Sequence, residues 1–340
     1  MSRSKRKLDH IRHALNRDEI AVNSFDEMEI VHQSLTDIHW DYISLQTQLG
    51  ELSLSSPLFV NAMTGGGGEK TEVINRDLAI AAKETGIALA VGSQMSAIND
   101  AQEKRSYQIV REENPNGVIF ANIGSEATVD QALQAVHMIE ANALQIHLNV
   151  LQELIMPEGD RDFSDRLQRI ESIVKHIDVP VIVKEVGYGM SMETARQLRE
   201  VGISYFDVAG YGGTNFSKVE NKRRKQPFRA FDQWGIPTAI SIAEVKASVP
   251  ECHVIASGGM RNGLDGAKAF VLGAEAFGMA GHLLRTLMKE DVETLIDEIN
   301  HIHHEFKIAM MLLGVTEPVS LKGKPHIYAG RMKAWLDQRL

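Results

Sequence analysis

Eight short apolar segments, separated by amphipathic stretches, constrain the fold of this 340-residue chain more than any other feature. They are rich in Val, Ile and Ala, as buried parallel strands are, and the stretches between them show helical periodicity. In residues 128–142, for example, Thr128 is a suitable N-cap and apolar residues recur at 129, 133, 136 and 139. The predicted strands are LFVNAM (58–63), IALAVGS (87–93), VIFANIG (118–124), ALQIHLN (143–149), PVIVKEV (180–186), SYFDVAG (204–210), HVIASGG (253–259) and EAFGMAG (275–281).

Strands and helices that alternate eight times predict an α/β fold of the (β/α)8 TIM barrel type. The alternative, a doubly wound open sheet, is expected to carry a G-x-G-x-x-G turn after its first strand. The glycines of TGGGGEKTEV, residues 64–73, lack that spacing. Polar residues recur near the carboxyl ends of the predicted strands, and a barrel gathers those ends on the face where barrel enzymes have their active sites. We therefore expect a barrel with a site at that face.

The rest of the chain is expected to form additions to the barrel. Residues 1–57 are predicted to be an N-terminal extension, helical or irregular over 18–32 and with a hairpin over 42–57, where YISLQTQLGELSLSSP alternates. Residues 58–340 are predicted to be the barrel domain with its C-terminal helices. The pattern that begins at Val292 predicts a long amphipathic helix near the end of the chain.

Composition limits the setting and the partners of the protein. Cys252 is the only cysteine, which excludes an intramolecular disulfide and a multi-cysteine zinc site and favours the reducing cytoplasm. No run approaches the roughly 18 apolar residues of a membrane span, and the basic start lacks the apolar region of a signal peptide. A net charge of −9 argues against nucleic acid as a partner. The basic segments at 3–7 and 222–225 suit an anion such as phosphate, although solvated charge is the simpler interpretation.

Two glycine-rich turns after the last two predicted strands indicate a phosphate site. They are SGGMRNG at 257–263 and GMAGHLL at 278–284. In barrels, the loops after strands seven and eight present backbone N–H groups and a helix N-terminus to a phosphate, and glycine permits close approach. Arg261 offers additional positive charge. In the alternative interpretation these glycines only form tight turns.

The phosphate belongs either to a substrate or to flavin mononucleotide (FMN), and Lys184 favours the flavin. A flavin ring needs hydrogen bonds along its pyrimidine edge and a positive group near N1, and Lys184 ends the fifth predicted strand. A buried unpaired ammonium is costly, so a lysine here indicates a partner. In the alternative interpretation Lys184 pairs with Glu185 or Asp207. Further donors at neighbouring strand ends are Thr64, Ser93 and Asn122.

The segment NALQIHLNVLQEL, which starts at residue 142, combines a strand with polar residues. Alternation places Gln145, His147 and Asn149 in the barrel interior and the apolar residues between them toward the helices. Gln152 and Glu153 follow the strand and extend the polar row beyond its end.

Together these motifs resemble the type 2 isopentenyl diphosphate isomerases, which are FMN-dependent barrels. The resemblance rests on RK and DHI near the N-terminus, NAMTGG, VGSQMSA, HLN followed by QE, VIVKEVGYGMS, GGTNF, SGGMRNG and GMAG, which span residues 6–281. One glycine loop is weak evidence, but the ordered set is highly specific. The resemblance implies interconversion of isopentenyl diphosphate and dimethylallyl diphosphate with reduced FMN, Mg2+, and NADPH or a comparable reductant. It also implies a homo-oligomer, either a tetramer or an octamer.

The resemblance further implies roles for individual residues. Those expected to hold FMN are Ala62, Met63, Thr64, Ser93, Asn122, Lys184, Thr214, Gly258, Gly259, Met260, Arg261, Ala280 and Gly281. Those expected at the substrate are Arg6, Lys7, Ser93, Gln94, Met95 and Gln152, with His10 as a further candidate. Since Arg6 and Lys7 precede the barrel, the extension would contribute to the substrate site. His147 and Gln152 are the catalytic candidates, and Glu153 is expected to ligate Mg2+. Some members of the family carry arginine at the position of Met95.

Two other functions remain to be compared with this one. Another FMN-dependent barrel oxidoreductase, such as a 2-hydroxy-acid dehydrogenase or oxidase, would share the phosphate loops and the lysine. It needs a histidine base beside arginines, however, and YGGTNF at 211–216 offers neither. A barrel that only binds phosphate or flavin would have no need of His147, Gln152 and Glu153 together.

Overall fold

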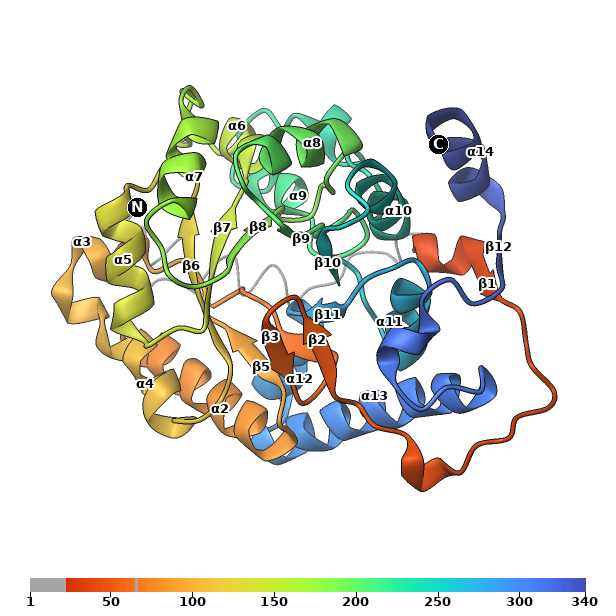
Figure 1. Ribbon diagram of the computed structural model, residues 1–340. Helices are drawn as coiled ribbons and strands as arrows, with labels where there is room; N and C mark the ends of the chain where they lie inside the picture. The colour runs from red at the N-terminus through yellow and green to blue at the C-terminus, as the bar shows by residue number, and fades with distance from the viewer. Residues whose placement is uncertain (1–22, 65–66) are drawn as a thin grey trace.

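The computed structural model of the chain describes residues 23–64 and 67–340 (Figure 1). All eight predicted strands are present, and hydrogen bonds join them in sequence order into a closed parallel barrel. They are β4 (Leu58–Val60), β5 (Ala88–Ala90), β6 (Ile119–Gly124), β7 (Ala143–His147), β8 (Val181–Lys184), β9 (Tyr205–Asp207), β10 (His253–Ser257) and β11 (Ala276–Met279). The predicted (β/α)8 TIM barrel is therefore confirmed.

Helices follow the strands and surround the barrel (Figure 1). The longer ones are α2 (Glu69–Thr85), α4 (Arg105–Glu113), α5 (Val129–Met138), α7 (Arg166–Val174), α8 (Met192–Glu200), α10 (Thr238–Ser248), α11 (Gly263–Val271) and α12 (Gly281–Lys289). Thr128 caps α5 as predicted, because its hydroxyl accepts from the backbone of Gln131 while the Gln131 side chain accepts from the backbone of Thr128. Three short helices lie in the loops after strands, namely α3 (Met95–Asn99), α6 (Val150–Ile155) and α9 (Phe216–Asn221).

A hairpin closes the amino-terminal end of the barrel. It consists of β2 (Thr47–Leu49) and β3 (Leu52–Leu54), which confirms the hairpin predicted over 42–57. Leu49 and Leu54 pack with the apolar interior residues near the starts of the strands, such as Phe59 and Phe120. The backbone N–H of Glu51 also donates to the Tyr205 hydroxyl at 3.2 Å. This packing leaves the carboxyl-terminal face for a site.

Segments near the two ends of the described chain meet beside the barrel (Figure 1). Strand β1 (Met28–Ile30) pairs with β12 (His326–Tyr328), although residues 18–32 were expected to be helical or irregular. The Glu27 carboxylate accepts from two backbone N–H groups in the first turn of α14 (Gly330–Arg339), at 3.1 and 2.8 Å. The predicted long helix is α13 (Val292–Leu312). None of the helices in the described ranges combines the length and the apolar character needed to cross a bilayer.

Helix α14 is attached to the barrel through Glu244 of α10, whose side chain is fully buried. The carboxylate accepts from Trp335 Nε1 at 2.7 Å and from Arg339 Nε and Nη2 at 2.9 and 3.1 Å. It also accepts from the backbone N–H of Met192 at 3.0 Å, so that one buried anion joins α8, α10 and α14. Because burial makes an unmet hydrogen-bonding group expensive, we infer that Glu244 is the main polar anchor of α14.

We predict that Glu244→Gln lowers the free energy of unfolding by about 1–3 kcal/mol, because the amide loses the charge and turns one acceptor into a donor. Urea denaturation measures this change. The control is Glu193→Gln, which removes an exposed contact to the same Arg339 at 2.7 Å and should have a much smaller effect. Equal losses in the two variants would contradict the anchoring role of the buried carboxylate.

Candidate functional site

Polar side chains inside the barrel form a continuous chain of hydrogen bonds below the carboxyl-terminal face. From the buried end, Asn61 Nδ2 donates to Asp207 Oδ2 at 2.7 Å, and Gln145 Nε2 donates to Asn61 Oδ1 at 3.3 Å. Asn122 Nδ2 then donates to Gln145 Oε1 at 3.1 Å, and His147 Nδ1 contacts Asn122 Oδ1 at 2.9 Å. We call these five residues the interior polar layer. The interior positions predicted for Gln145 and His147 are thus confirmed.

The direction of these hydrogen bonds follows from Asp207, because a carboxylate only accepts. Asn61 must therefore present its amide N–H2 to Asp207 and its carbonyl oxygen to Gln145. The same reasoning along the chain makes Asn122 Oδ1 an acceptor, so that Nδ1 of His147 is the protonated ring nitrogen. In the neutral imidazole, Nε2 is then the basic nitrogen. The interior polar layer thereby orients a catalytic candidate.

Lys184 adds a positive charge beside the interior polar layer. Its side chain is 7% exposed, and Nζ lies 3.9 Å from Asp207 Oδ2 and donates to the carbonyl oxygen of Glu185 at 2.8 Å. The pairing with Asp207 that was the alternative interpretation of this lysine is therefore present. It does not exclude a flavin contact, because an ammonium group has three N–H donors.

Glu185, which the sequence suggested only as a partner of Lys184, is a further titratable group beside it. Although the residue as a whole is partly exposed, its carboxylate lies against the following backbone and accepts from the N–H groups of Val186 and Tyr188 at 2.6 and 2.7 Å. Burial of the carboxyl group raises the pKa of Glu185 to about 7, against the opposing effect of these two bonds. A proton donor or acceptor near neutral pH therefore follows Lys184 directly.

The loops after β9 and β10 approach each other through their backbones. Gly258 and Gly259 have φ angles of +97° and +79°, which residues with a side chain rarely adopt. A Cβ atom on Gly259 would lie 2.5 Å from the backbone carbon of Gly212, and one on Gly213 would lie 2.6 Å from the Gly259 nitrogen. The glycines of the predicted phosphate turn are thus required by the packing of the two loops.

Three of the predicted flavin contacts are close together at this face. A Cβ atom on Gly281 would lie 3.2 Å from Thr214 Oγ1 and 3.4 Å from Met63 Cε. These residues come from the loops after β11, β9 and β4. Gly281 also begins helix α12, for which no side chain of the described residues caps the first turn. Its N–H groups are therefore suited to a phosphate.

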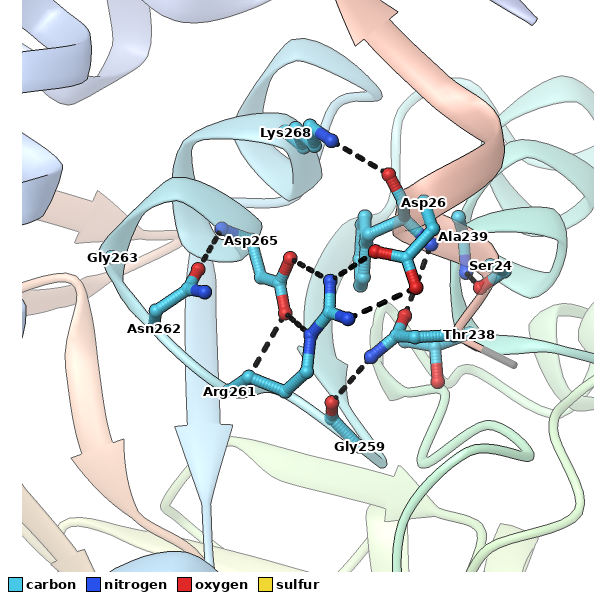
Figure 2. Close-up of polar contacts among 12 residues, drawn as sticks. Ser24, Asp26, Thr238, Ala239, Gly259, Arg261, Asn262, Gly263, Asp265 and Lys268 are labelled. Atoms are coloured by element: carbon cyan, nitrogen blue, oxygen red, sulfur yellow. Dashed lines mark hydrogen bonds and ion pairs between the residues drawn. The ribbon is translucent and has the colours of Figure 1, made fainter. Parts of the chain in front are cut away.

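Arg261 ends the predicted phosphate turn, and its guanidinium lies between two carboxylates (Figure 2). Nε and Nη2 donate to Asp265 at 2.8 and 2.9 Å, and Nη1 and Nη2 donate to Asp26 at 3.0 and 2.7 Å. The hydrogen bonds to Asp265, followed by those to Asp26, raise the pKa of Arg261 further above its usual value. Its charge is shared by these acids, and a direct contact with FMN stays a prediction.

Glu153, the expected metal ligand, lies in α6 directly after β7. Its Oε1 accepts from Asn149 Nδ2 and its Oε2 accepts from the backbone N–H of Asp160, both at 2.9 Å. These bonds orient the carboxylate. Gln152 precedes it in the same helix and is partly exposed. Within residues 23–64 and 67–340, no group of three His, Cys, Asp or Glu side chains is placed to hold a metal ion.

The side chains of two other candidates support the barrel itself. Gln94 is fully buried, and its amide donates to the carbonyl oxygen of Ala135 and accepts from the N–H of Asn122, both at 3.0 Å. The hydroxyl of Thr64 donates to Asn75 Oδ1. Near the carboxyl ends of their strands lie Ala62, Ser93, Met95, Met260 and Ala280. The candidates that lie outside the described residues are Arg6, Lys7 and His10.

Known proteins resemble this chain over most or all of its length. Residues 121–327 match the family described as FMN-dependent dehydrogenase. Over 100% of its length, the chain is 56% identical to the isopentenyl-diphosphate delta-isomerase of Geobacillus sp. (strain WCH70), of which it covers 97%. It is 49% identical to the isopentenyl-diphosphate delta-isomerase of Bacillus pumilus (strain SAFR-032), of which it covers 96%.

Solved structures with the same fold include mandelate oxidases. A mandelate oxidase variant with a monooxide FMN adduct matches 96% of this chain and 93% of its own, with a TM-score of 0.66 and 15% identity. A second mandelate oxidase structure matches 97% of this chain and 100% of its own, with a TM-score of 0.67 and 16% identity. At these identities the likeness shows a shared barrel fold. On the full-length sequence identity, the chain belongs to the isopentenyl-diphosphate delta-isomerase family, and its barrel belongs to the FMN-dependent dehydrogenase family.

Proposed function

We propose that this protein interconverts isopentenyl diphosphate and dimethylallyl diphosphate, with reduced FMN as an acid–base cofactor and Mg2+ at the diphosphate. The observation that carries the proposal is that an oriented histidine and a backbone cradle lie at the same face of the barrel. The interior polar layer ends at an oriented histidine, His147, and the glycine loops after β9 and β10 form a backbone cradle beside Thr214 and Gly281. The full-length identity to named isomerases supports the same reaction.

The residues of the cradle fit FMN. The N–H groups at the start of α12 and in the Gly258–Gly259 turn suit its phosphate, and Lys184 suits the electron-rich edge of its ring. When bound and reduced, FMN would supply a group that gives and takes a proton, which the reaction needs because it involves no net change in oxidation state. NADPH or a comparable reductant would keep the flavin reduced.

The chain itself supplies orientation and metal binding in this proposal. His147 holds a basic nitrogen at Nε2, and Gln152 contacts the isoprene unit from the start of α6. Glu153 would hold Mg2+, which prefers carboxylate, phosphate and water oxygens, and the substrate diphosphate would supply further ligands. The hairpin and the apolar residues near the starts of the strands close the amino-terminal end of the barrel, so that water is excluded from that end.

A 2-hydroxy-acid oxidase is the alternative, and two observations count against it. The loop at 211–216 contains no histidine or arginine, whereas such an enzyme needs a histidine base beside arginines that bind the carboxylate. In this chain, Gly212 and Gly213 of that loop instead pack against the backbone of the Gly258–Gly259 turn. The mandelate oxidases share 15–16% identity with this chain, far below the isomerases.

The proposal extends to the assembly and the cellular setting of the protein. A homo-oligomer, tetramer or octamer, rests on the resemblance to the family. A cytoplasmic setting rests on the single cysteine. Cys252 is buried, and burial raises its pKa to about 11, which fits an unreactive thiol.

The proposed function predicts that the purified protein, loaded with FMN and reduced without oxygen, converts isopentenyl diphosphate into dimethylallyl diphosphate in the presence of Mg2+. Product formation is measured by NMR. Protein without FMN, and loaded protein with oxidised flavin, should be inactive. No conversion by the reduced, FMN-loaded protein with Mg2+ would overturn the proposal.

Glu153→Gln should lower kcat/KM roughly 10²-fold, since a neutral amide binds Mg2+ poorly and the metal no longer stabilises charge on the diphosphate. FMN affinity, measured by flavin fluorescence, should not change. A matched control is Glu171→Gln, which removes a partly exposed carboxylate on α7. Loss of FMN binding in the Glu153 variant, or an unchanged dependence on Mg2+, would contradict the assignment.

Lys184→Ala should weaken FMN binding by about tenfold or more and change the absorption spectrum of the reduced flavin, because a charge-assisted donor near N1 is lost. Equilibrium titration and anaerobic spectra measure the two effects. If affinity and spectrum both match the unmodified protein, Lys184 serves only to neutralise Asp207.

A further inference from the structure

The segment that precedes the barrel contacts the phosphate turn directly. We call Asn23–Asp26 the anchor segment. Asn23 Nδ2 donates to the carbonyl oxygen of Gly259 at 2.7 Å, while Asn23 Oδ1 accepts from the N–H of Phe25 at 3.0 Å. Asp26 binds the guanidinium of Arg261, the residue that ends the turn (Figure 2). Two different side chains of the anchor segment therefore hold the same turn.

Other contacts make the anchor segment a fixed part of the barrel face. The Ser24 hydroxyl accepts from the N–H of Ala239 at 3.0 Å in the first turn of α10, and Lys268 Nζ of α11 donates to the carbonyl oxygen of Phe25 at 2.7 Å (Figure 2). Asn23 and Ser24 are both 4% exposed, and Phe25 is fully buried. The segment is thus held by two helices that flank the phosphate turn.

The bond from Asn23 determines the direction of a backbone donor. In a planar trans peptide the C=O and the following N–H point in opposite directions. A hydrogen bond that holds the carbonyl oxygen of Gly259 on one side therefore directs the N–H of Met260 to the other side. Thr238 does the same for the preceding peptide, because its hydroxyl donates to the carbonyl oxygen of Gly258 at 2.5 Å and so directs the N–H of Gly259.

Arg261 acts through the same segment. Nε, Nη1 and Nη2 all donate to Asp265 or Asp26, so the guanidinium joins α11 to the anchor segment across the turn. A group held by two carboxylates adds little net positive charge at the turn. The turn must then bind an anion chiefly through its backbone N–H groups, whose directions the surrounding side chains determine.

We propose that Asn23 and Asp26 are positioning residues for the phosphate of FMN, because they hold the Gly258–Arg261 turn so that the N–H groups of Gly259 and Met260 can bind it. The N–H of Arg261 itself donates to Asp265 at 3.2 Å. The inference rests on the proposed function, since it requires FMN at this turn. It assigns a role in cofactor binding to residues outside the barrel. It also predicts that the role concerns the phosphate and not the flavin ring.

The test compares FMN with riboflavin, which lacks the phosphate, by fluorescence titration of Asn23→Ser and Asp26→Asn. Serine keeps the capping acceptor for Phe25 but is too short to reach Gly259. Each variant should bind FMN about three- to tenfold more weakly, the effect of one lost hydrogen bond, with riboflavin affinity unchanged. Asp37→Asn, which alters an exposed carboxylate of the same extension, is the control and should not weaken FMN binding.

The direction in which Asp26→Asn changes FMN affinity distinguishes this positioning role from a direct contact between Arg261 and the phosphate. If Arg261 bound the phosphate itself, releasing it from Asp26 would strengthen FMN binding. Stronger or unchanged FMN binding would overturn the inference, as would equal weakening of FMN and riboflavin, which indicates a general loss of structure. Thermal unfolding without flavin checks that each variant folds. Asn23→Ser also leaves the ion pair between Asp26 and Arg261 intact. If the unmodified protein failed to bind FMN, the proposed function would fall as well.

Discussion

The charge of Asp207 is the constraint around which the barrel interior is organised. Its side chain has no exposed surface, and a carboxylate buried there must be paired and hydrogen-bonded. Lys184, Asn61 and Ser257 satisfy it from β8, the end of β4 and β10. Because this acid can only accept, it also determines the direction of the bonds that lead through two further amides to His147. The interactions that hold the core thus prepare the site.

The same principle applies at the predicted phosphate turn, where neighbouring polar side chains hold the backbone in place. Asn23 and Thr238 donate to the carbonyl oxygens of Gly259 and Gly258. The anchor segment continues into β1, which pairs with β12, and Glu27 caps α14. Parts of the chain that are remote in sequence therefore support one loop. Here that loop depends on a segment outside the repeated βα units.

The sequence predicted those parts of the fold that arise from local patterns. The eight strands, the hairpin and the N-cap of α5 each depend on residues close together in the chain. The β1–β12 pair was missed because each strand has three residues and the partners are at opposite ends of the chain. Arg261 was correctly located in the turn, but its partner Asp26 could not be identified, because an arginine and an aspartate 235 positions apart carry no local signal. Gln94 was expected at the substrate from the family resemblance, and no local pattern shows that its amide bonds to backbone groups of Ala135 and Asn122.

The central claim is that this barrel uses a flavin for proton transfer without net oxidation. The most direct measurement follows flavin absorbance and product together when the anaerobically reduced, FMN-loaded protein receives isopentenyl diphosphate and Mg2+ in D2O. We predict dimethylallyl diphosphate that contains deuterium, formed over many turnovers while the flavin stays reduced. Oxidation of the flavin in step with substrate consumption would contradict the account and favour an oxidoreductase.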